Sequence, residues 1–422
     1  MILIIADQYM LVTYKKIMIY NLLILILSNL VFSLPTYANP EFSKKMVWAN
    51  IGFNNSFPIH DDSSGFLRNS SGVQLKETRN NTTAQLRLNL LDHKHLKFDQ
   101  TYLNYKYKNT IFGIGKINRH WSFSSKNSLI LSSNARSSNS IYFNIKKDKK
   151  SKIKLFSWAG PWSYEMFNSV LKNQNGPSNS MLLGMRAIIN PINNLKFELV
   201  KTSQWGGENK NSSIKAFKNA IIGNTNENKY KDINQLAGFG FSYNTGAKKI
   251  PFEIYGQFIG EDEAGNLPSC FMKLMGATLD FKNVDLSTKI GLEYLDTRID
   301  ETTHGNCGPN TAYNNGSYKY TNYDVTLGAP IDTESKSIEI WGTTNISQNK
   351  SINYSIKKII INDTNWSSHR LSSNRQEGWL NKLGMTISTD SFEIQSDLSY
   401  QDTPFGNSLH GLSLNLNTIY KF

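Results

Sequence analysis

Side chains that could bind a sugar recur along this 422-residue chain, close to the ends of apolar segments. Aromatic rings pack against the apolar face of a sugar, while amide, carboxylate and guanidinium groups hydrogen-bond to its hydroxyls. Trp and Tyr near strand ends also commonly anchor proteins at a membrane interface, so each aromatic candidate has that second interpretation. The candidate binding residues are Arg119, Trp121, Asn134, Arg136, Trp162, Tyr164, Gln204, Trp205, Glu261 and Asp262.

Residues that could hold a metal or catalyse a reaction are not grouped in the sequence. Glu261, Asp262 and Glu263 could offer oxygen ligands to Ca²⁺, but adjacent strand residues point in alternate directions, which favours a solvated or salt-bridged rim. The seven His residues show no metal-ligand spacing. No GxSxG, GxGxxG or phosphate-binding loop lies between a strand and a helix. We therefore expect no enzyme activity, no cofactor and no bound metal.

The composition restricts the class of partner. Lys and Arg total 46 against 33 Asp and Glu, giving a net charge of +13 and a pI near 9.4. The basic residues are spread singly, and no zinc-finger or RNP pattern occurs, so the sequence does not favour nucleic-acid binding. A basic outward surface suits an acidic polysaccharide or the phosphates of lipopolysaccharide.

The first residues have the form of a secretory signal. Lys15 and Lys16 precede an apolar run over residues 17–32, and small residues follow up to Ala38. A positive flank, a short apolar core and a small-residue cut site define such a signal. The run is shorter than a membrane-spanning helix and has no basic stop-transfer cluster after it. We predict a cleaved signal peptide at 1–38 and a single domain at 39–422.

Apolar and polar residues alternate along many segments of this domain. A strand has a side-chain period of two, so one of its faces is apolar and the other polar. Charges of both signs occupy the polar face, as expected in a wet lumen and costly in a dry sandwich core. Ile419 breaks the alternation, and the chain ends on Tyr420 and Phe422, typical of the last strand of an outer-membrane barrel. The clearest segments are 195–199, 250–258, 286–294, 392–400 and 411–422.

Short and long connections alternate between these segments, as they do in bacterial outer-membrane barrels. With Phe422 at the periplasmic end, the short turns lie inside and the long loops outside. We predict a closed, all-β, antiparallel transmembrane barrel of about eighteen strands, with sixteen as the alternative and a short helix in one extracellular loop. The predicted turns are Asp148–Ser151, Asn190–Asn194, Asn244–Lys249, Lys282–Asp285, Ser347–Lys350 and Ser388–Ser391. The predicted loops are Gly160–Ser180, Ser203–Asn234, Glu261–Cys270, Arg298–Glu334, Asp363–Glu377 and Thr403–Gly411.

Two features of the predicted barrel leave alternatives open. Cys270 and Cys307, the two cysteines of the chain, fall in outward loops; they can pair as a disulfide in an oxidising compartment or remain free thiols. The lumenal charges could line a water-filled channel or form a network that closes it. These lumenal residues are Arg87, Lys196, Glu253, Glu293, Glu339 and Glu393.

Several segments resemble the Wzi-like family of capsule-assembly outer-membrane proteins, in the order in which the family carries them. The resemblance implies an eighteen-strand barrel in the bacterial outer membrane that associates with capsular polysaccharide and helps to hold it at the cell surface. It also implies a lectin-like role with no known chemistry. The segments are Ser128–Ser137, Gly160–Phe167, Ser203–Glu208, Tyr255–Ser269 and Glu293–Thr297.

We therefore expect an outer-membrane barrel that binds capsular or other surface polysaccharide through its outward loops, in contact with outer-membrane lipid and lipopolysaccharide. One alternative is a diffusion channel for small, mainly anionic solutes, because a large barrel can hold water and the chain is basic. Another is a structural barrel that contacts polysaccharide export machinery.

Overall fold

The computed structural model describes residues 42–54, 56–58, 69–91, 95–150, 153–223, 233–246, 251–264, 267–282, 286–299 and 307–422. The predicted signal peptide, 1–38, lies outside these residues. Among the described residues, no helix combines the length and the apolar character needed to cross a bilayer.

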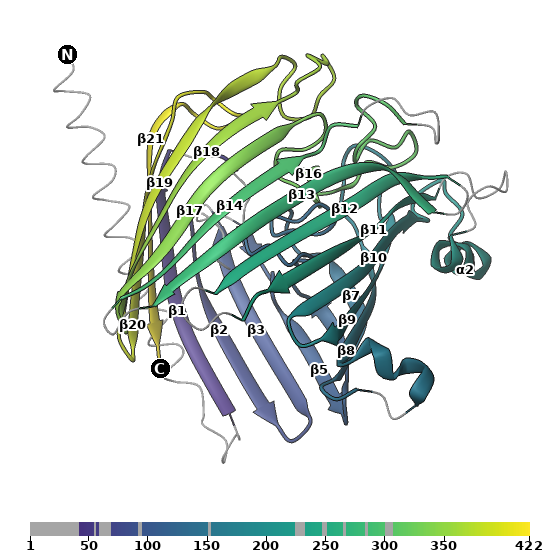
Figure 1. Cartoon of the computed structure of the whole chain (residues 1–422), viewed down its shortest axis with the longest axis horizontal. Coiled ribbons are helices and arrows are strands. Elements are labelled where there is room, and N and C mark those ends of the chain that lie inside the picture. Colours follow the sequence, from purple (N-terminus) through teal and green to yellow (C-terminus); the bar gives the residue numbers. More distant parts are fainter. Residues whose placement is uncertain are drawn as a thin grey trace.

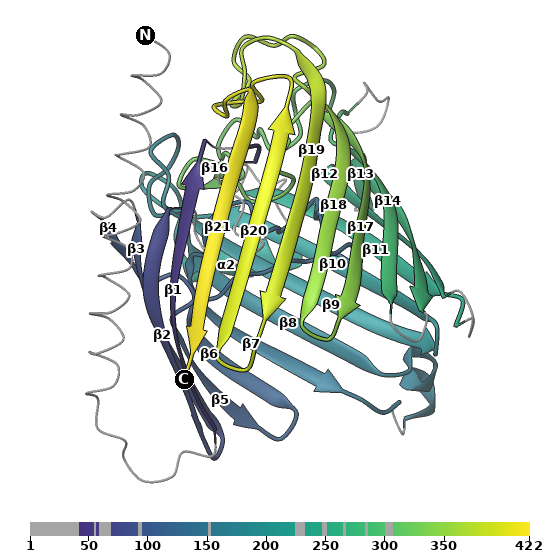
Figure 2. The same ribbon diagram turned by 90° about the vertical axis from the view of Figure 1, so that its left-hand side faces the viewer.

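Eighteen antiparallel strands close into a barrel, because β1 pairs with β2 on one side and with β21 on the other (Figure 1). Figure 2 shows this seam, with β21 between β1 and β20. Closure leaves no unpaired strand edge, as a membrane requires. A short further strand, β4 (His95–Lys97), adds to β3. The wall strands are β1 (Phe42–Phe53), β2 (Ser70–Arg79), β3 (Thr82–Leu91), β5 (Tyr102–Tyr107), β6 (Thr110–Lys116), β7 (Asn139–Lys147), β8 (Trp162–Val170), β9 (Met181–Ile192), β10 (Leu195–Trp205), β11 (Asn234–Asn244), β12 (Phe252–Ala264), β13 (Leu267–Lys282), β14 (Ser287–Asp296), β17 (Lys336–Ser347), β18 (Lys350–Ile361), β19 (Gln376–Ser388), β20 (Phe392–Gln401) and β21 (Gly411–Lys421).

The alternating pattern places apolar side chains outside the barrel and polar ones inside. On β17, Ile338 and Ile340 are 45% and 57% exposed, while the intervening Glu339 and the next residue, Trp341, are 8% and 4% exposed. The exception in the pattern of β21 has a clear reason, because Ile419 faces inward and packs in a small apolar cluster with Met46 and Trp48. The predicted barrel and its strand number are confirmed.

The two ends of the barrel differ in the length of their connections. At the end where β21 finishes, which we call the turn end, strands are joined by links as short as 80–81, 193–194 and 348–349. At the opposite end, which we call the loop end, connections run over 117–138, 206–233, 297–335 and 362–375. One of them contains a helix, α2 (Ile214–Ile222), which begins at the capping hydroxyl of Ser213 and ends at Gly223 in the left-handed region.

Two of the loop-end connections turn into the barrel and fill part of it. We call residues 117–138 and 307–335 together the plug. Their apolar residues join those of the wall in one large buried cluster that includes Trp121, Leu129, Ile130, Tyr313 and Tyr320. The second plug segment carries a small hairpin of β15 (Thr321–Asn322) and β16 (Val325–Thr326). The plug therefore gives the barrel a packed core that strand alternation alone does not predict.

Two predicted connections are wrong. The predicted turn Asp148–Ser151 is a longer link, 148–161, that contains the 3-10 helix η1 (Lys154–Ala159). The predicted loop Gly160–Ser180 contains the whole of β8, and only residues 171–180 form a connection at the loop end. Both connections were placed wrongly because the aromatic and aliphatic residues of η1 are also typical of a strand.

The predicted loop Glu261–Cys270 is also wrong, since β12 and β13 extend through it. The ladder continues through the pairs Asp262 with Ser269 and Ala264 with Leu267, which leaves only 265–266 between the two strands, outside the described residues. Polar residues on a long hairpin look like a loop in the sequence, although their backbone groups are paired.

Candidate functional site

Glu293 on β14 anchors the first plug segment to the wall. Its carboxylate accepts hydrogen bonds from the Ser124 hydroxyl, from Asn127 Nδ2 at 2.7 Å and from the Tyr255 hydroxyl at 2.7 Å. The Glu293 side chain is almost completely buried. A buried carboxylate needs such donors, because an unpaired one would lose its hydration without compensation. The plug is therefore held by a polar socket in the wall.

A second socket lies on β12 and β10. Gln257 donates through Nε2 to the Trp121 carbonyl at 2.5 Å and to Glu198 Oε1 at 2.9 Å, and its Oε1 accepts from the Leu129 amide at 2.8 Å. Glu198 also pairs with Arg186 of β9 at 2.6 Å. One side-chain amide thus fixes two backbone positions of the plug.

Arg119 and Trp121, predicted to face outward, are buried inside the barrel instead. Arg119 Nε lies 2.8 Å from Glu165 Oε1, and its guanidinium stacks 3.9 Å from the Phe167 ring centroid. Trp121, 1% exposed, donates through Nε1 to Glu165 Oε2 at 3.3 Å. Both side chains are bonded to Glu165 of β8, so the prediction that they face outward is wrong. The loop folds inward because its apolar residues gain burial there.

The second plug segment is tied to the first by two tyrosines. Tyr313 donates to the Leu129 carbonyl at 2.6 Å, and Tyr320 donates to the Ile130 carbonyl at 2.9 Å. The two rings stack with centroids 5.8 Å apart. Burial raises the pKa of Tyr313 well above its ordinary value, so its hydroxyl remains a donor. The two segments consequently behave as one packed unit.

Two further candidates, Asn134 and Gln204, form hydrogen bonds inside the protein. Asn134 is buried and donates through Nδ2 to the Thr326 carbonyl at 2.9 Å. Gln204 is buried and donates through Nε2 to the Lys319 carbonyl at 2.8 Å. These amides satisfy backbone groups of the plug, and neither presents its polar atoms to the outside.

The candidates Trp205 and Glu261 also contact neighbouring parts of the protein. Trp205 donates to Asn168 Oδ1 at 3.1 Å and lies under Phe217 of α2, with ring centroids 5.3 Å apart. Glu261 accepts from the Tyr313 amide at 3.0 Å, whereas the side chain of Asp262 lies outside the described residues. Among the residues that the structure describes, no three His, Cys, Asp or Glu side chains are grouped as a metal site.

Trp162 and Tyr164 lie at the turn end, on the first residues of β8. Both are half-buried, and the Tyr164 ring packs 5.8 Å from that of Phe143 on β7. Their predicted place in an outward loop is wrong, because β8 rises from the turn end and reaches the loop end only at Val170. Their position fits an aromatic anchor at a membrane interface.

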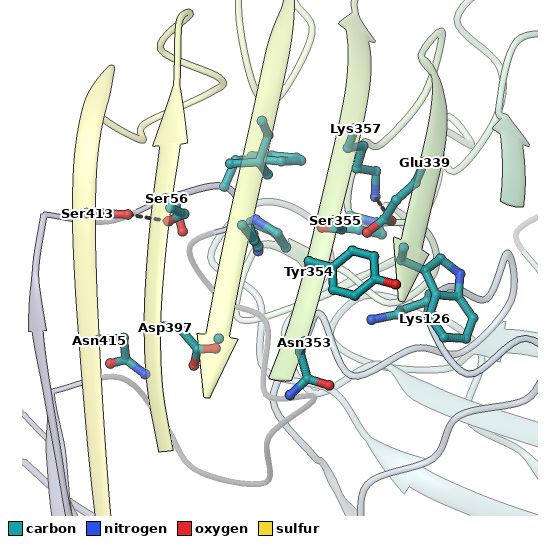
Figure 3. Close-up of a pocket in the computed structure, with 18 of the residues that line it drawn as sticks. Ser56, Lys126, Glu339, Asn353, Tyr354, Ser355, Lys357, Asp397, Ser413 and Asn415 are labelled. Atoms are coloured by element: carbon teal, nitrogen blue, oxygen red, sulfur yellow. Dashed lines mark hydrogen bonds and ion pairs between the residues drawn. The ribbon is translucent and has the colours of Figure 1, made fainter. Parts of the chain in front are cut away.

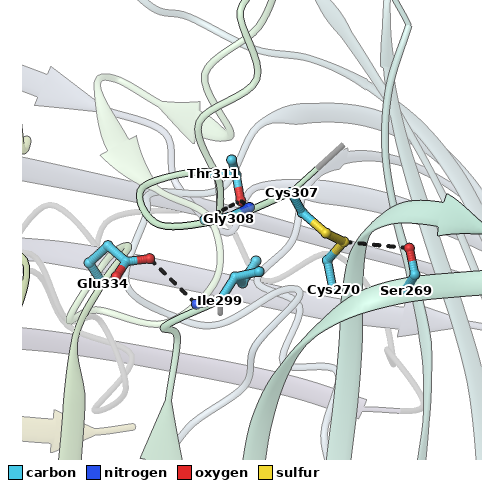
Figure 4. The surroundings of a disulfide bond; sticks show 7 residues. All are labelled: Ser269, Cys270, Ile299, Cys307, Gly308, Thr311 and Glu334. Carbon is cyan, nitrogen blue, oxygen red and sulfur yellow. Dashed lines mark hydrogen bonds between the residues drawn. A yellow bond between two sulfur atoms is a disulfide. The ribbon is translucent and has the colours of Figure 1, made fainter. Parts of the chain in front are cut away.

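A disulfide joins Cys270 to Cys307, with the two Cα atoms 6.1 Å apart (Figure 4). Cys270 belongs to β13, and Cys307 begins the second plug segment. Nearby, Glu334 accepts hydrogen bonds from the amides of Ile299, at 3.4 Å, and Asn310, at 2.8 Å. The disulfide and this carboxylate together tether the plug to the loop end of β13 and β14.

A candidate binding surface remains at the loop end, and Tyr323 is its centre. The ring of Tyr323 is 38% exposed, and the Arg136 guanidinium stacks 4.7 Å from its centroid. Arg136 is held by Asp99, with Nη2 to Oδ2 at 2.5 Å and Nε to Oδ1 at 3.2 Å. Of the predicted candidates, Arg136 lies on this surface, while its aromatic partner is not one of them.

The turn that presents Tyr323 is braced by the 171–180 loop. Tyr323 and Asp324 both have positive φ, at 53° and 60°, in the hairpin between β15 and β16. The Asp324 carboxylate accepts from the amides of Gln174 and Asn175, each at 3.1 Å. The Tyr323 amide donates to the Lys172 carbonyl at 2.5 Å. The ring is therefore presented by a fixed backbone.

Further cations lie close to Arg136, the partner of this ring. Lys116 lies within electrostatic range of Lys97, Arg136 and Lys172, with Asp99 as the opposing charge. These four cations face the carboxylates of Asp99 and of Asp324, which lies in the same turn as Tyr323, so the net charge at this surface is +2. We call Lys97, Asp99, Lys116, Arg136, Lys172 and Tyr323 the loop-end surface. Its lysines lie at the end of β4, at the end of β6 and in the 171–180 connection, so no local sequence pattern marks them. Only the Asn322-Tyr323-Asp324 turn, with a ring between two turn-forming residues, could have been noticed.

The charges on the other side of the loop end neutralise each other. Asp363 is paired with Arg298 at 2.9 Å, Arg375 at 2.9 Å and Lys336 at 3.4 Å. Burial opposes the ionisation of Asp363, but the hydrogen bonds from Arg375 and Arg298 outweigh it and lower the pKa of this carboxyl. This network ties three connections together, whereas the loop-end surface keeps an excess of positive charge.

The closed wall, the outward apolar face and the inserted loops define the class of plugged β-barrels of the outer-membrane type. The chain belongs to the capsule assembly protein Wzi family, which matches residues 45–409. It is an outer-membrane protein, as the family is.

Individual relatives agree with this assignment. A Klebsiella pneumoniae protein described as an uncharacterized 55.8 kDa protein in the cps region is 34% identical over 121 residues, which span 28% of this chain and 24% of that protein. Escherichia coli Wzi, described as an outer membrane protein involved in group 1 capsule assembly and as a carbohydrate-binding β-barrel, superposes with a TM-score of 0.78 at 20% identity, covering 90% of this chain and 84% of that one. OccD3 of Pseudomonas aeruginosa has a TM-score of 0.50 at 11% identity over 93% and 97% of the two chains, a likeness of fold.

Proposed function

We propose that this protein binds an acidic capsular polysaccharide without covalent chemistry through its loop-end surface, and thereby helps to hold the capsule at the cell surface. The observation that carries the proposal is the exposed Tyr323 ring, stacked on Arg136, which belongs to a group of cations with Lys97, Lys116 and Lys172. An aromatic ring offers a platform for the apolar face of a sugar, and the cations attract carboxylates along the polymer.

The direction of the barrel supports this proposal. Outer-membrane barrels have short periplasmic turns and longer extracellular loops. The loop end, with its longer connections, would then face the medium where a capsule lies. A polymer chain could cross several connections there, and each weak contact would add to the others on one strand of polymer.

The plug argues against the diffusion-channel alternative. Leu129 and Ile130 are fully buried within the lumen, and Glu293, Gln257 and Glu165 hold the first plug segment against three strands. A solute crossing the barrel would have to displace this packed core. Single-channel recordings in planar bilayers should show no steady conductance steps, and steady steps would support the channel instead.

The test of polysaccharide tethering compares variants in a strain from which the gene has been deleted. Complementation with the wild-type gene should restore cell-associated polymer, while Tyr323→Ala combined with Lys116→Ala should leave most polymer in the medium and total synthesis unchanged. Both substitutions remove side chains at the surface and leave the buried contacts of the plug in place. If cell-associated and free polymer stay at wild-type levels, the tethering role is wrong.

A matched control lies elsewhere at the same end of the barrel. Leu409 is 59% exposed in the connection before β21 and belongs to no part of the loop-end surface. Leu409→Ala should retain polymer as the wild type does. Because electrostatic contacts weaken as salt rises, release by the wild-type strain should also increase with ionic strength.

A further inference from the structure

A cavity of about 530 Å³ lies inside the barrel, between the plug and the wall formed by β17–β21 and β1 (Figure 3). Its volume lies within the roughly 300–1,000 Å³ typical of small-molecule sites. Plug residues 125–127 and 132–134, together with 56–58 after β1, line it from the loop end. It occupies the part of the lumen that the plug leaves empty.

The wall of this cavity is rich in hydroxyl and amide groups. Inward-facing positions on consecutive strands form rungs across the wall, such as Thr343, Asn353, Gly384, Asp397 and Asn415, each paired in register with the next. Several of these side chains point into the cavity in Figure 3. Gly384 has no side chain, and the Asp397 carboxylate occupies the space where its Cβ would stand. Rows of amides and hydroxyls of this kind suit a ligand with many hydroxyls.

One indole completes the lining. Trp341 on β17 lies flat across Gly291 of β14, where any Cβ would come within 2.3 Å of the ring. The ammonium of Lys126, from the plug, lies 4.8 Å from the ring centroid. The ring is thus held between wall and plug, at the border of the cavity.

Buried polar atoms at this cavity lack partners within the described protein. Trp341 Nε1, Asn50 Oδ1 and Asn415 Oδ1 make no hydrogen bond there, although all three residues line the cavity. Trp341 is 4% exposed and Asn50 is 1% exposed. A buried donor or acceptor without a partner is unfavourable, so a ligand that supplied complementary hydroxyls would gain binding free energy from each. These groups are one donor, Trp341 Nε1–H, and two acceptors, the Oδ1 atoms of Asn50 and Asn415. A sugar hydroxyl can bond to either kind, because it both accepts and donates a hydrogen bond.

The charge of the lining is slightly positive. The lining contains three lysines and two carboxylates, so its net charge is +1; they are Lys126, Lys357, Lys382, Glu339 and Asp397. Lys357 and Glu339 neutralise each other at 3.2 Å. The lining therefore accepts a neutral or singly acidic ligand better than a highly charged one.

Access is from the turn end. None of the turn-end connections, in the part of the chain that the structure describes, contributes to the lining. Wall residues that do contribute reach down to Asn353 and Thr386, which lie close to the ends of β18 and β19 at that side. A ligand would enter opposite to the loop-end surface.

We propose that this cavity is a second carbohydrate site, which takes a short, neutral or singly acidic saccharide entering from the turn end. It is separate from the loop-end surface and does not depend on that surface binding polymer. Its contacts are the hydroxyl and amide rungs of β17–β21, with the Trp341 N–H donating to a sugar oxygen.

The test is photo-cross-linking of the purified full chain in detergent. Maltotriose and tri-galacturonic acid, each carrying a diazirine at the reducing end, serve as the neutral and acidic probes. Peptide mass spectrometry should place adducts from at least one of them on residues 339–357 and 382–399. Trp341→Phe keeps the ring but removes the N–H, and should weaken labelling about fivefold, the equivalent of one hydrogen bond of roughly 1 kcal/mol.

Two neighbouring residues on β19 provide a matched pair of variants. Thr386 lines the cavity, so Thr386→Trp should fill it and reduce lumenal labelling more than tenfold. Met385, 45% exposed on the outer face, gives the control Met385→Trp, which should label like the wild type. Tyr323→Ala should leave lumenal labelling unchanged, whatever its effect on polymer retention. Absence of lumenal adducts with both probes, or equal labelling of the two Trp variants, would overturn the proposal.

Discussion

The two sides of the barrel interior use the same strand pattern in different ways. On the plugged side, from β8 to β14, the inward carboxylates Glu165, Glu198 and Glu293 bond to the plug or to residues that hold it. On the open side, from β17 to β21, inward residues bond mainly to the neighbouring strand, as Ser399 does with Ser413 at 2.5 Å. An inward polar residue can therefore be part of a socket or of a wet wall, and alternation alone does not distinguish them.

The largest expected effect separates two lumenal glutamates. Glu293→Ala removes the acceptor of three hydrogen bonds, two from the plug and one from Tyr255 of β12, and leaves these donors unpaired. Stability should therefore fall by about 5 kcal/mol, since bonds to a charged group contribute about 1.5–3 kcal/mol each. Thermal unfolding in detergent measures the loss, and conductance steps in planar bilayers would report a loosened plug. Glu393→Ala is the matched control on the open side, where the half-buried partner Lys421 should make the loss less than about 1 kcal/mol. Equal losses would remove the distinction between the two sides.

The disulfide should have the next largest effect. It closes a separation of 37 residues, for which chain entropy predicts a contribution of about 4 kcal/mol. The Cys270→Ser/Cys307→Ser double variant should therefore lose stability by nearly that amount, and the second plug segment should exchange amide hydrogens faster. Wild-type protein treated with a reductant should match the variant. If the β17–β21 wall loosened as much as the plug did, the tether would not be specific to the plug.

A smaller effect should follow from pH at the loop end. Burial lowers the pKa of His369, partly offset by Asp332, and the ring's Nδ1 accepts from the amides of Leu371, at 3.1 Å, and Ser372, at 3.4 Å. A folded pKa below the unfolded value of 6.5 means that protonation favours the unfolded connection. The stability of the 362–375 connection is therefore complete above that value and is lost as the pH falls below it.

Hydrogen exchange measures this effect. Amides of 362–375 should exchange faster at pH 5.5 than at pH 7.5, after correction for intrinsic rates. His369→Asn keeps an acceptor in place of Nδ1 but does not titrate, so it should abolish this part of the pH dependence. An unchanged dependence in the variant would assign the effect to another group.

The smallest effect concerns the open wall. Ser413→Ala removes one hydroxyl pair between β20 and β21, and a neutral hydrogen bond contributes about 1 kcal/mol at most sites. Because the cavity lies beside it, solvent can satisfy the remaining Ser399 hydroxyl, and the loss should be smaller than that. Ser124→Ala, which removes a comparable hydroxyl from the plug, should cost more, and the reverse order would contradict the comparison.

Much of the fold could be predicted from local sequence, but the candidate site could not. Alternation along 411–422 predicted β21 and its outward face, and most of the short turns and long loops followed from polar segments between strands. Trp162 and Tyr164 were misplaced because η1 resembles a strand in composition. Arg119, Trp121, Asn134, Gln204 and Trp205 have residue types that suit sugar binding, yet the same types suit hydrogen bonding in a buried plug.

The amino-acid sequence by itself determined that this chain forms a closed barrel with one apolar and one polar face, because strand periodicity is a property of neighbouring residues. Only the tertiary structure decided which loops enter the lumen, which carboxylates hold them and where a cavity remains. Contacts such as Ser124 with Glu293 join residues 169 positions apart, and no local pattern encodes such a pairing. The same holds for the surface around Tyr323, whose cations come from strand ends and connections that meet only after the barrel closes.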